Sequence, residues 1–259
     1  MISRTVKRNV ASVTGVMMAF SLLLILVAPA SAEEAFSITK KRDYYDIPGR
    51  HMALLEDPGK ELTIDQVSGP DYRDKFVASK EEVPNIGQTR SAWWIRFAIK
   101  NDSGQDKDWF LELNHPLIDY VSLYIADPTG DFTELRQGRA MPYTAKAVKR
   151  RTFVFEQKLK AGEVRRYYLR AQSGDGIVFP LRLMSPVEFI KSERKDQIVL
   201  GILLGAMIII MIYNFFIFFM SRDESYLYLV FFIFSFLFYI ISENGIGNEF
   251  VWRKITWMS

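Results

Sequence analysis

The stretch NFFIFFMSRDESYLYLVFF, Asn214–Phe232, decides the fold of the C-terminal part of the chain, because a few polar residues interrupt an otherwise apolar run. No charged residue occurs from Ile198 to Met220, and at about 1.5 Å per residue this run crosses a hydrocarbon core of about 30 Å. A second apolar run begins at Tyr226 and has tyrosines near its ends, where amphipathic rings meet the membrane interface. We predict transmembrane helices over residues 198–220 and 226–242, joined by the tight turn SRDES. The alternative, two buried helices of a soluble core, requires apolar cover that the rest of the chain lacks.

The N-terminus predicts the side on which this turn lies. A basic segment, MISRTVKR, precedes the apolar VTGVMMAFSLLLILV, and APASA supplies small residues at Ala30 and Ala32. This order is typical of a secretory signal peptide, residues 1–32, cleaved after Ala32. An uncleaved membrane anchor is the alternative. Both place the region up to Gln197 outside the cytoplasm, the turn inside, and the tail 243–259 outside again.

The distribution of basic residues supports this topology only weakly. Arg222 is the single base in the inner turn, whereas Lys191, Arg194 and Lys195 lie just outside the first span. Long translocated domains cross largely regardless of charge, so the signal peptide decides the orientation.

Composition limits what the exported region, residues 33–197, binds. It has 27 bases and 26 acids and no basic stripe with interleaved aromatics, so we expect no nucleic-acid partner. The local cluster VKRR, ending at Arg151, is interpreted as a solvated loop rather than a phosphate site. The chain has no cysteine, so an exported domain has no disulfides and is held by an ordinary hydrophobic core.

Hydrophobic residues alternate with period two along the exported region, as in strands with one buried face. In SAWWIRFAIK, residues 91–100, the odd positions from Trp93 to Ile99 are apolar, and the same parity recurs in DWFLELN, DYVSLYIA, RTFVFEQ, RRYYLRA and GIVFPLRLM. Turn signals such as NDSGQD, DPTGD and SGDG separate the runs. This spacing predicts an all-β jelly-roll-like sandwich over residues 33–190, followed by the two transmembrane α-helices. Residues 35–85 are expected to form an irregular lead-in with one or two further strands.

The order SAWWIRFAIKN, WFLELNHPLIDYVSLYI, RRTFVFEQKLKAGEVRRYYLRAQS, LLGAMIIIMIYNFFIFFMSRDESYLYLVFF and SENGIGNEFVW resembles the seven-transmembrane receptors with diverse intracellular signalling modules (7TMR-DISM), which are bacterial membrane sensors. The resemblance covers roughly residues 38–257. It implies a periplasmic jelly roll similar to carbohydrate-binding modules, a seven-helix bundle and a cytoplasmic output such as a histidine kinase or diguanylate cyclase. The sequence holds two of those seven helices and no output domain, so we expect no enzymatic output from this chain alone.

Residue types argue for binding over catalysis. His51 and His115 lack the spacing of metal ligands, a cysteine nucleophile is absent, and no GxSxG elbow occurs. The acids in NDSGQDKD lack an EF-hand pattern and favour a hairpin loop over a calcium site. We therefore predict no catalytic residue, no metal site and no cofactor.

Even-numbered strand positions carry the candidate ligand-binding residues. If the odd positions face the core, the even positions point away from it. They present aromatic rings that can stack on sugars, and guanidiniums that can donate bidentate hydrogen bonds to hydroxyls or carboxylates. Arg151, at the start of its strand, is a further polar candidate. The alternative is that these side chains pack under the lead-in or against a neighbour, and parity does not tell which sheet each strand joins. The six candidates are Trp94, Arg96, Tyr124, Tyr168, Arg170 and Arg182.

The first predicted span carries candidate helix-packing residues. Gly201 and Gly205 lie one turn apart, which allows another helix to approach closely, and Asn214 offers an amide for an interhelical hydrogen bond. Partner helices in a receptor or in a homo-oligomer are expected to use them.

Together these features predict a bacterial inner-membrane sensory receptor whose periplasmic sandwich recognises a ligand such as a carbohydrate and passes the signal to membrane helices. Two alternatives stay open: a membrane-tethered carbohydrate-binding or carbohydrate-processing protein, and a structural adaptor of another receptor. The sequence leaves open the ligand, the output of any parent or partner protein, the oligomeric state, and whether the chain is a natural short form or a fragment.

Overall fold

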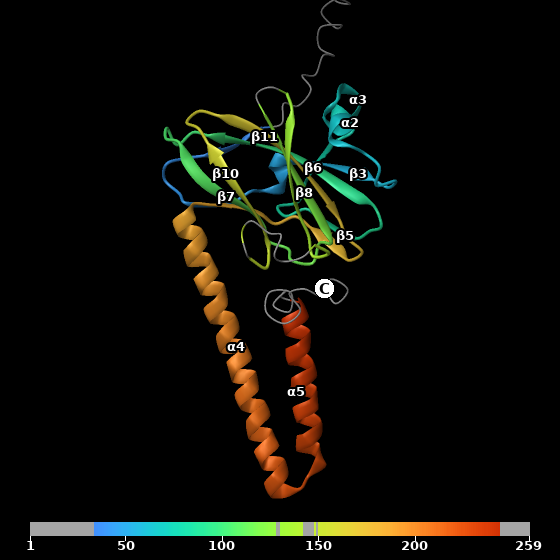
Figure 1. The fold of residues 1–259 in the computed structure, drawn as a ribbon, viewed down its shortest axis with the longest axis vertical. Helices are drawn as coiled ribbons and strands as arrows, with labels where there is room; N and C mark the ends of the chain where they lie inside the picture. The colour runs from blue at the N-terminus through green and yellow to red at the C-terminus, as the bar shows by residue number, and fades with distance from the viewer. Residues whose placement is uncertain (1–33, 128–129, 142–147, 149, 244–259) are drawn as a thin grey trace, which may run out of the picture. The chain divides into compact units, whose positions relative to one another are not determined.

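The computed structural model describes residues 34–127, 130–141, 148 and 150–243 (Figure 1). These residues form two main β-sheets followed by two long helices. The predicted signal peptide, residues 1–32, lies outside the described residues, as does most of the predicted tail, from residue 244. Both stay predictions.

The strands form a sandwich of two main sheets. The larger has seven strands, in the order β4-β3-β6-β11-β8-β9, with β1 parallel to β6. The smaller has four, in the order β10-β7-β13-β2, and β12 pairs with β5 separately. This confirms the predicted all-β jelly-roll-like sandwich followed by α-helices. The strands are β1 (Phe36–Ile38), β2 (Tyr44–Asp46), β3 (Met52–Asp57), β4 (Val77–Ala78), β5 (Asn85–Gln88), β6 (Ala92–Asn101), β7 (Lys107–Leu113), β8 (Tyr120–Ala126), β9 (Phe132–Gln137), β10 (Phe153–Leu159), β11 (Val164–Gln172), β12 (Gly176–Val178) and β13 (Leu181–Met184).

The main core contains the odd-numbered apolar residues of these strands. Ile95, Phe97 and Ile99 of β6 have no exposed surface and belong to the same buried cluster as Leu111 of β7 and Leu183 of β13. The cluster thus draws on both sheets. Because successive side chains of a strand point to opposite faces, the alternation read from the sequence also identified the core face.

The lead-in is more structured than expected. Besides β1 to β4 it holds a short 3-10 helix, η1 (Gly49–His51), and two short helices, α2 (Ile64–Ser68) and α3 (Pro70–Arg73). Thr63 caps α2: its hydroxyl accepts a hydrogen bond from the Gln66 amide, and the Gln66 side chain accepts one from the Thr63 amide. This capping box is a sequence signal for a helix start, and it explains why a polar segment folds here.

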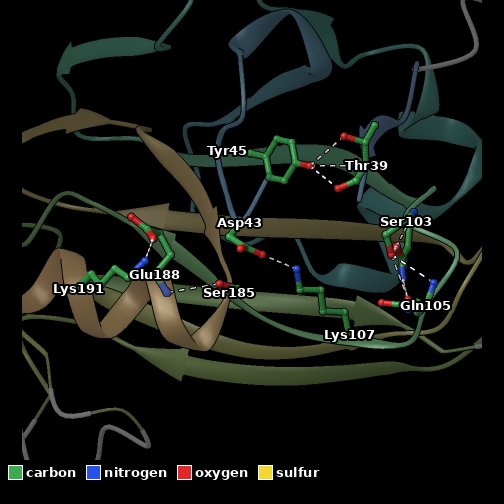
Figure 2. Close-up of polar contacts among 10 residues, drawn as sticks. Thr39, Asp43, Tyr45, Ser103, Gln105, Lys107, Ser185, Glu188 and Lys191 are labelled. Carbon is green, nitrogen blue, oxygen red and sulfur yellow. Dashed lines mark hydrogen bonds and ion pairs between the residues drawn. The ribbon is translucent and has the colours of Figure 1, made fainter. Parts of the chain in front are cut away.

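The hairpin loop predicted for NDSGQD is tied together by its own side chains. The Asn101 side-chain amide donates to the carbonyls of Gln105, Leu159 and Lys160. The Ser103 hydroxyl donates to the Asn101 side chain at 2.6 Å and contacts the Gln105 carbonyl at 3.1 Å, and Figure 2 shows Ser103 beside Gln105. Gly104 has φ +73°, a conformation that glycine adopts without steric cost. The polar residues thus stabilise a turn between β6 and β7.

Two helices follow the sandwich, α4 (Pro186–Ser221) and α5 (Glu224–Glu243), and they pack against one another. Both are long and apolar enough to cross a membrane, and they contain the predicted spans 198–220 and 226–242. α4 begins well before Ile198, because the Ser185 hydroxyl caps it by accepting from the Glu188 amide and Pro186 occupies its first turn. It ends at Ser221, and the following residue, Arg222, makes the tight turn into α5 with a φ of 57°.

Candidate functional site

The fold brings five of the six candidate ligand-binding residues together on the outer face of the larger sheet. Arg96 on β6 lies opposite Tyr168 on β11, and Trp94 lies opposite Arg170. Tyr168 in turn lies opposite Tyr124 on β8. The rings of Trp94 and Tyr124 stack with centroids 5.4 Å apart. Side chains from three adjacent strands therefore form one continuous patch of rings and guanidiniums.

This patch is partly covered by the lead-in. Trp94 has no exposed surface and Tyr168 retains 4%, and both pack with Val67 of α2 and with Phe76 in a second, smaller hydrophobic cluster. Arg96, Tyr124 and Arg170 are half-buried at its margin. The large rings thus serve as a core under α2 and α3, and ligand access in this arrangement is limited to the marginal residues.

Both arginines of the patch also hold the lead-in. The Arg96 guanidinium lies 4.5 Å from the centre of the Phe76 ring and donates to the Arg73 carbonyl at 3.3 Å. Arg170 donates to the Lys60 carbonyl at 3.0 Å. Burial and the neighbouring Glu134 carboxylate raise the pKa of the Tyr124 phenol, so Tyr124 stays a neutral hydrogen-bond donor at physiological pH.

Arg182, the sixth candidate, lies on the smaller sheet and is not part of the patch. It sits on β13 opposite Asp46 of β2 on one side and Glu112 of β7 on the other. Its Nε is 3.4 Å from the Asp46 carboxylate, which also accepts a hydrogen bond from the Tyr44 hydroxyl at 2.7 Å. Burial, together with the hydrogen bond to Asp46, raises the pKa of Tyr44 to about 12. The outer face of the smaller sheet therefore carries its own chain of polar contacts.

A buried polar cluster joins the smaller sheet to α4. Glu112 has no exposed surface and accepts a short hydrogen bond from the Thr152 hydroxyl. The Arg150 side chain, 7% exposed, places its Nε 3.4 Å from the Glu112 carboxylate and an Nη 3.2 Å from the Asp196 carboxylate of α4. Its guanidinium also lies 4.7 Å from the centre of the Phe189 ring. We call these five residues, Glu112, Arg150, Thr152, Phe189 and Asp196, the junction.

Aromatic packing and backbone contacts complete this connection. Phe189 stacks on Phe110 of β7 with ring centroids 4.5 Å apart. The Ser185 amide donates to the Asp43 carbonyl at 2.8 Å, and Asp43 forms an ion pair with Lys107 (Figure 2). The start of α4 is thus held both to the residue that precedes β2 and to β7.

The junction was missed by the sequence reasoning. The interpretation of VKRR as a solvated loop is wrong for Arg150, which is buried because Glu112 and Asp196 supply carboxylates for it. Arg151 is half-buried, and Lys149 lies outside the described residues. A charged Glu112 between the apolar Leu111 and Leu113 was the available signal, but its partner is distant in sequence.

The helix-packing candidates divide between two sides of α4. Asn214 is buried, and its amide donates to the Ile210 carbonyl of the same helix at 2.8 Å. Gly201 and Gly205 face open space, since a Cβ added to either would meet no atom within 4 Å. At about 100° per residue Asn214 points nearly opposite to Gly205, so the three do not form one contact face within the described helices.

Comparison with protein families gives two matches that together span most of the chain. The family model 7TMR-DISM extracellular 2 matches residues 49–185, and the model 7TM diverse intracellular signalling matches residues 196–259. No curated protein matches the chain.

Several solved structures resemble the sandwich at low identity. TmCBM61 in complex with β-1,4-galactotriose has a TM-score of 0.29 and 8% identity, and the match covers 56% of this chain and 99% of that one. CBM35 from Cellvibrio japonicus Abf62 has a TM-score of 0.27 and 12% identity, with 54% and 91% covered. The β-glucosidase from Kluyveromyces marxianus in complex with glucose has a TM-score of 0.33 and 11% identity, with 63% and 19% covered. TM-scores this low carry no conclusion about a ligand.

Proposed function

Because the chain belongs to the 7TMR-DISM family of membrane sensory receptors, we propose that its sandwich recognises a ligand in the periplasm of a bacterium and that α4 carries the response into the inner membrane. Transmission of this kind requires an element that contacts the ligand-recognition domain and also enters the membrane.

One observation carries the proposal: the sandwich continues into the first apolar helix without a linker. β13 ends at Met184, Ser185 caps the helix, and α4 begins at Pro186. The junction adds side-chain contacts, since Arg150 bridges Glu112 in the sheet and Asp196 on the helix. A displacement of the smaller sheet therefore acts directly on a helix that extends to Ser221.

We propose a neutral or acidic saccharide as the ligand. The support is the patch of rings and guanidiniums on the larger sheet, whose chemistry suits stacking on sugar rings and forked hydrogen bonds to hydroxyls or carboxylates. Arg96, Tyr124 and Arg170 at its half-buried margin are the side chains we expect to touch the sugar first. Trp94 and Tyr168 support them from beneath and contact the ligand only if the lead-in moves.

Calorimetry with the full chain in neutral-lipid nanodiscs, against a panel of cell-envelope and exopolysaccharide glycans, tests ligand recognition. We expect heat with at least one glycan and its loss in the Arg170→Gln and Tyr124→Phe variants. Arg50→Gln, which changes an exposed arginine paired with Glu82, is the matched control. Absence of heat with every glycan, or equal binding by all variants, contradicts a saccharide site on this patch. Trp94→Ala is unsuitable here, because emptying a fully buried site destabilises the fold itself.

Transmission is tested separately with spin labels. The chain has no cysteine, so Val164→Cys on the sandwich and Met220→Cys near the end of α4, both exposed, give a clean labelled pair. We expect a saccharide that binds to shift the distance distribution between these labels, and Asp196→Asn, which removes the helix side of the Arg150 bridge at little cost in stability, to weaken that shift. Binding that leaves the distribution unchanged contradicts transmission through α4.

A further inference from the structure

The part of α4 that precedes the apolar span has two chemically different sides. Phe189 and Asp196 contact the sandwich through Phe110 and Arg150. At about 100° per residue, Lys191 and Arg194 project from roughly the opposite side of the helix. One side is thus occupied by the junction, whereas among the described residues the other side is exposed.

This exposed side carries three bases next to exposed apolar residues. Lys191, Arg194 and Lys195 are all exposed, and they line an open groove of about 440 Å³ together with Ile190, Ile198 and Val199. Ile190 is 58% exposed, Ile198 54% and Val199 60%. We call this set the basic groove. Its composition, bases followed by apolar residues along one helix face, is that of a surface for an amphiphilic anion.

The position of the basic groove along the helix matches the depth of lipid headgroups. The uncharged span begins at Ile198, so Lys195 lies about 4.5 Å and Lys191 about 10.5 Å above the hydrocarbon boundary at 1.5 Å per residue. The headgroup regions add roughly 5 to 8 Å on each side of the core. Flexible Lys and Arg side chains therefore reach phosphates at this level while Ile198 and Val199 contact the first acyl carbons.

We propose that the basic groove binds the phosphate headgroup of an anionic phospholipid, with the acyl chain lying along Ile198 and Val199. Arg194 supplies a planar fork for two phosphate oxygens, and the two lysines supply point charges. Glu188, beside the groove, lies 3.2 Å from Lys191, and this exposed ion pair competes only weakly with a bound anion. This lipid contact is independent of the saccharide proposed for the sandwich.

Charge argues against a second copy of the chain as the occupant. Two parallel copies packed through this face would bring six bases together, and like charges placed opposite one another at an interface are costly. An anionic headgroup has the complementary sign, and each base near an anionic surface strengthens binding by about fivefold.

Native mass spectrometry of the full chain in neutral detergent tests this proposal. Phosphatidylglycerol and phosphatidylcholine are titrated in parallel, and bound lipid is counted for each. We expect preferential binding of phosphatidylglycerol, and a loss of affinity of about fivefold for each base removed in Lys191→Gln, Arg194→Gln and Lys195→Gln, alone and combined. Phosphatidylcholine binding should not change.

The matched control is the combination Lys80→Gln, Lys158→Gln and Lys160→Gln, which removes three exposed bases of the sandwich. Retained phosphatidylglycerol binding in this control, with loss in the groove variant, supports the proposal. Equal loss in both variants, or none in either, overturns it. Displacement of the lipid by millimolar inorganic phosphate would also overturn it, since the site would then be a free-anion site. A dimer that forms without lipid and dissociates in the triple variant of Lys191, Arg194 and Lys195 would also overturn the proposal, because the groove would then be a contact between two copies of the chain.

Discussion

Replacement of Arg150 by glutamine is expected to destabilise the chain far more than an ordinary surface change. The Arg150 side chain is 7% exposed, and its partner Glu112 is fully buried. Removal of one member of a buried ion pair leaves the other charge without compensation, at a cost of about 3 to 5 kcal/mol. Asp196, 45% exposed, forms the second ion pair of Arg150, and its replacement by asparagine should cost about 1 kcal/mol or less.

Thermal unfolding of the full chain in detergent, followed by near-ultraviolet circular dichroism, measures these effects. For a domain of this size each kcal/mol shifts Tm by about 2 to 4 °C, so Arg150→Gln should lower Tm by roughly 6 to 20 °C. The double variant Arg150→Gln, Glu112→Gln should recover much of this loss, because no buried charge is left unpaired and Thr152 still has an acceptor. A normal Tm for Arg150→Gln, or no recovery in the double variant, would refute the buried pair as the source of stability.

Further expectations concern packing, pH and topology. Gly138→Ala should cost about 1 to 3 kcal/mol, because an added Cβ collides with the Asp119 backbone carbonyl. Gly201→Ala, which faces open space inside α4, should instead stabilise by about 0.5 to 1 kcal/mol, because alanine favours the helix. Chemical denaturation of both variants compares them, and similar losses would contradict the reasoning. The pKa of Tyr44 is raised from 10.0 to about 12. The stability that the protonated Tyr44 phenol contributes is therefore present below pH 10 and is lost as pH rises toward 12. Measurements of Tm against pH should show that the Tyr44→Phe variant lacks this loss. Alkaline phosphatase fused after Gln197 should be active and the same fusion after Asp223 inactive; the reverse activities would contradict the proposed topology.

Much of the fold was predictable because it depends on local periodicity. The alternation around Ile95, Phe97 and Ile99 identifies both the strand and its buried face, since the pleat reverses the side chain at each residue. The two membrane spans follow from length and apolarity alone. The helix α2 was missed, although the capping box of Thr63 and Gln66 was readable, because the surrounding residues are polar and short of apolar periodicity.

The candidate site was only partly predictable, because it depends on contacts between distant segments. The even numbers of Trp94 and Arg170 predicted that both side chains point away from the core. Only the pairing of β6 with β11 makes them neighbours. The assignment of Arg182 to the other sheet, and the cover of Phe76 over Tyr168, depend on strand order and on the path of the lead-in. Burial of Arg150 likewise requires carboxylates from β7 and α4, which no local pattern brings together.

The absence of a linker between β13 and α4 has a mechanical consequence. α4 runs for 36 residues without an internal proline, so under the proposed transmission it acts as a rod about 54 Å long at 1.5 Å per residue. A tilt of only about 5° at Ser185 would carry the far end sideways through about 5 Å, given its length of about 54 Å. If α4 transmits as proposed, small rearrangements among the strands are thereby amplified into a displacement comparable with the spacing between side chains of packed helices.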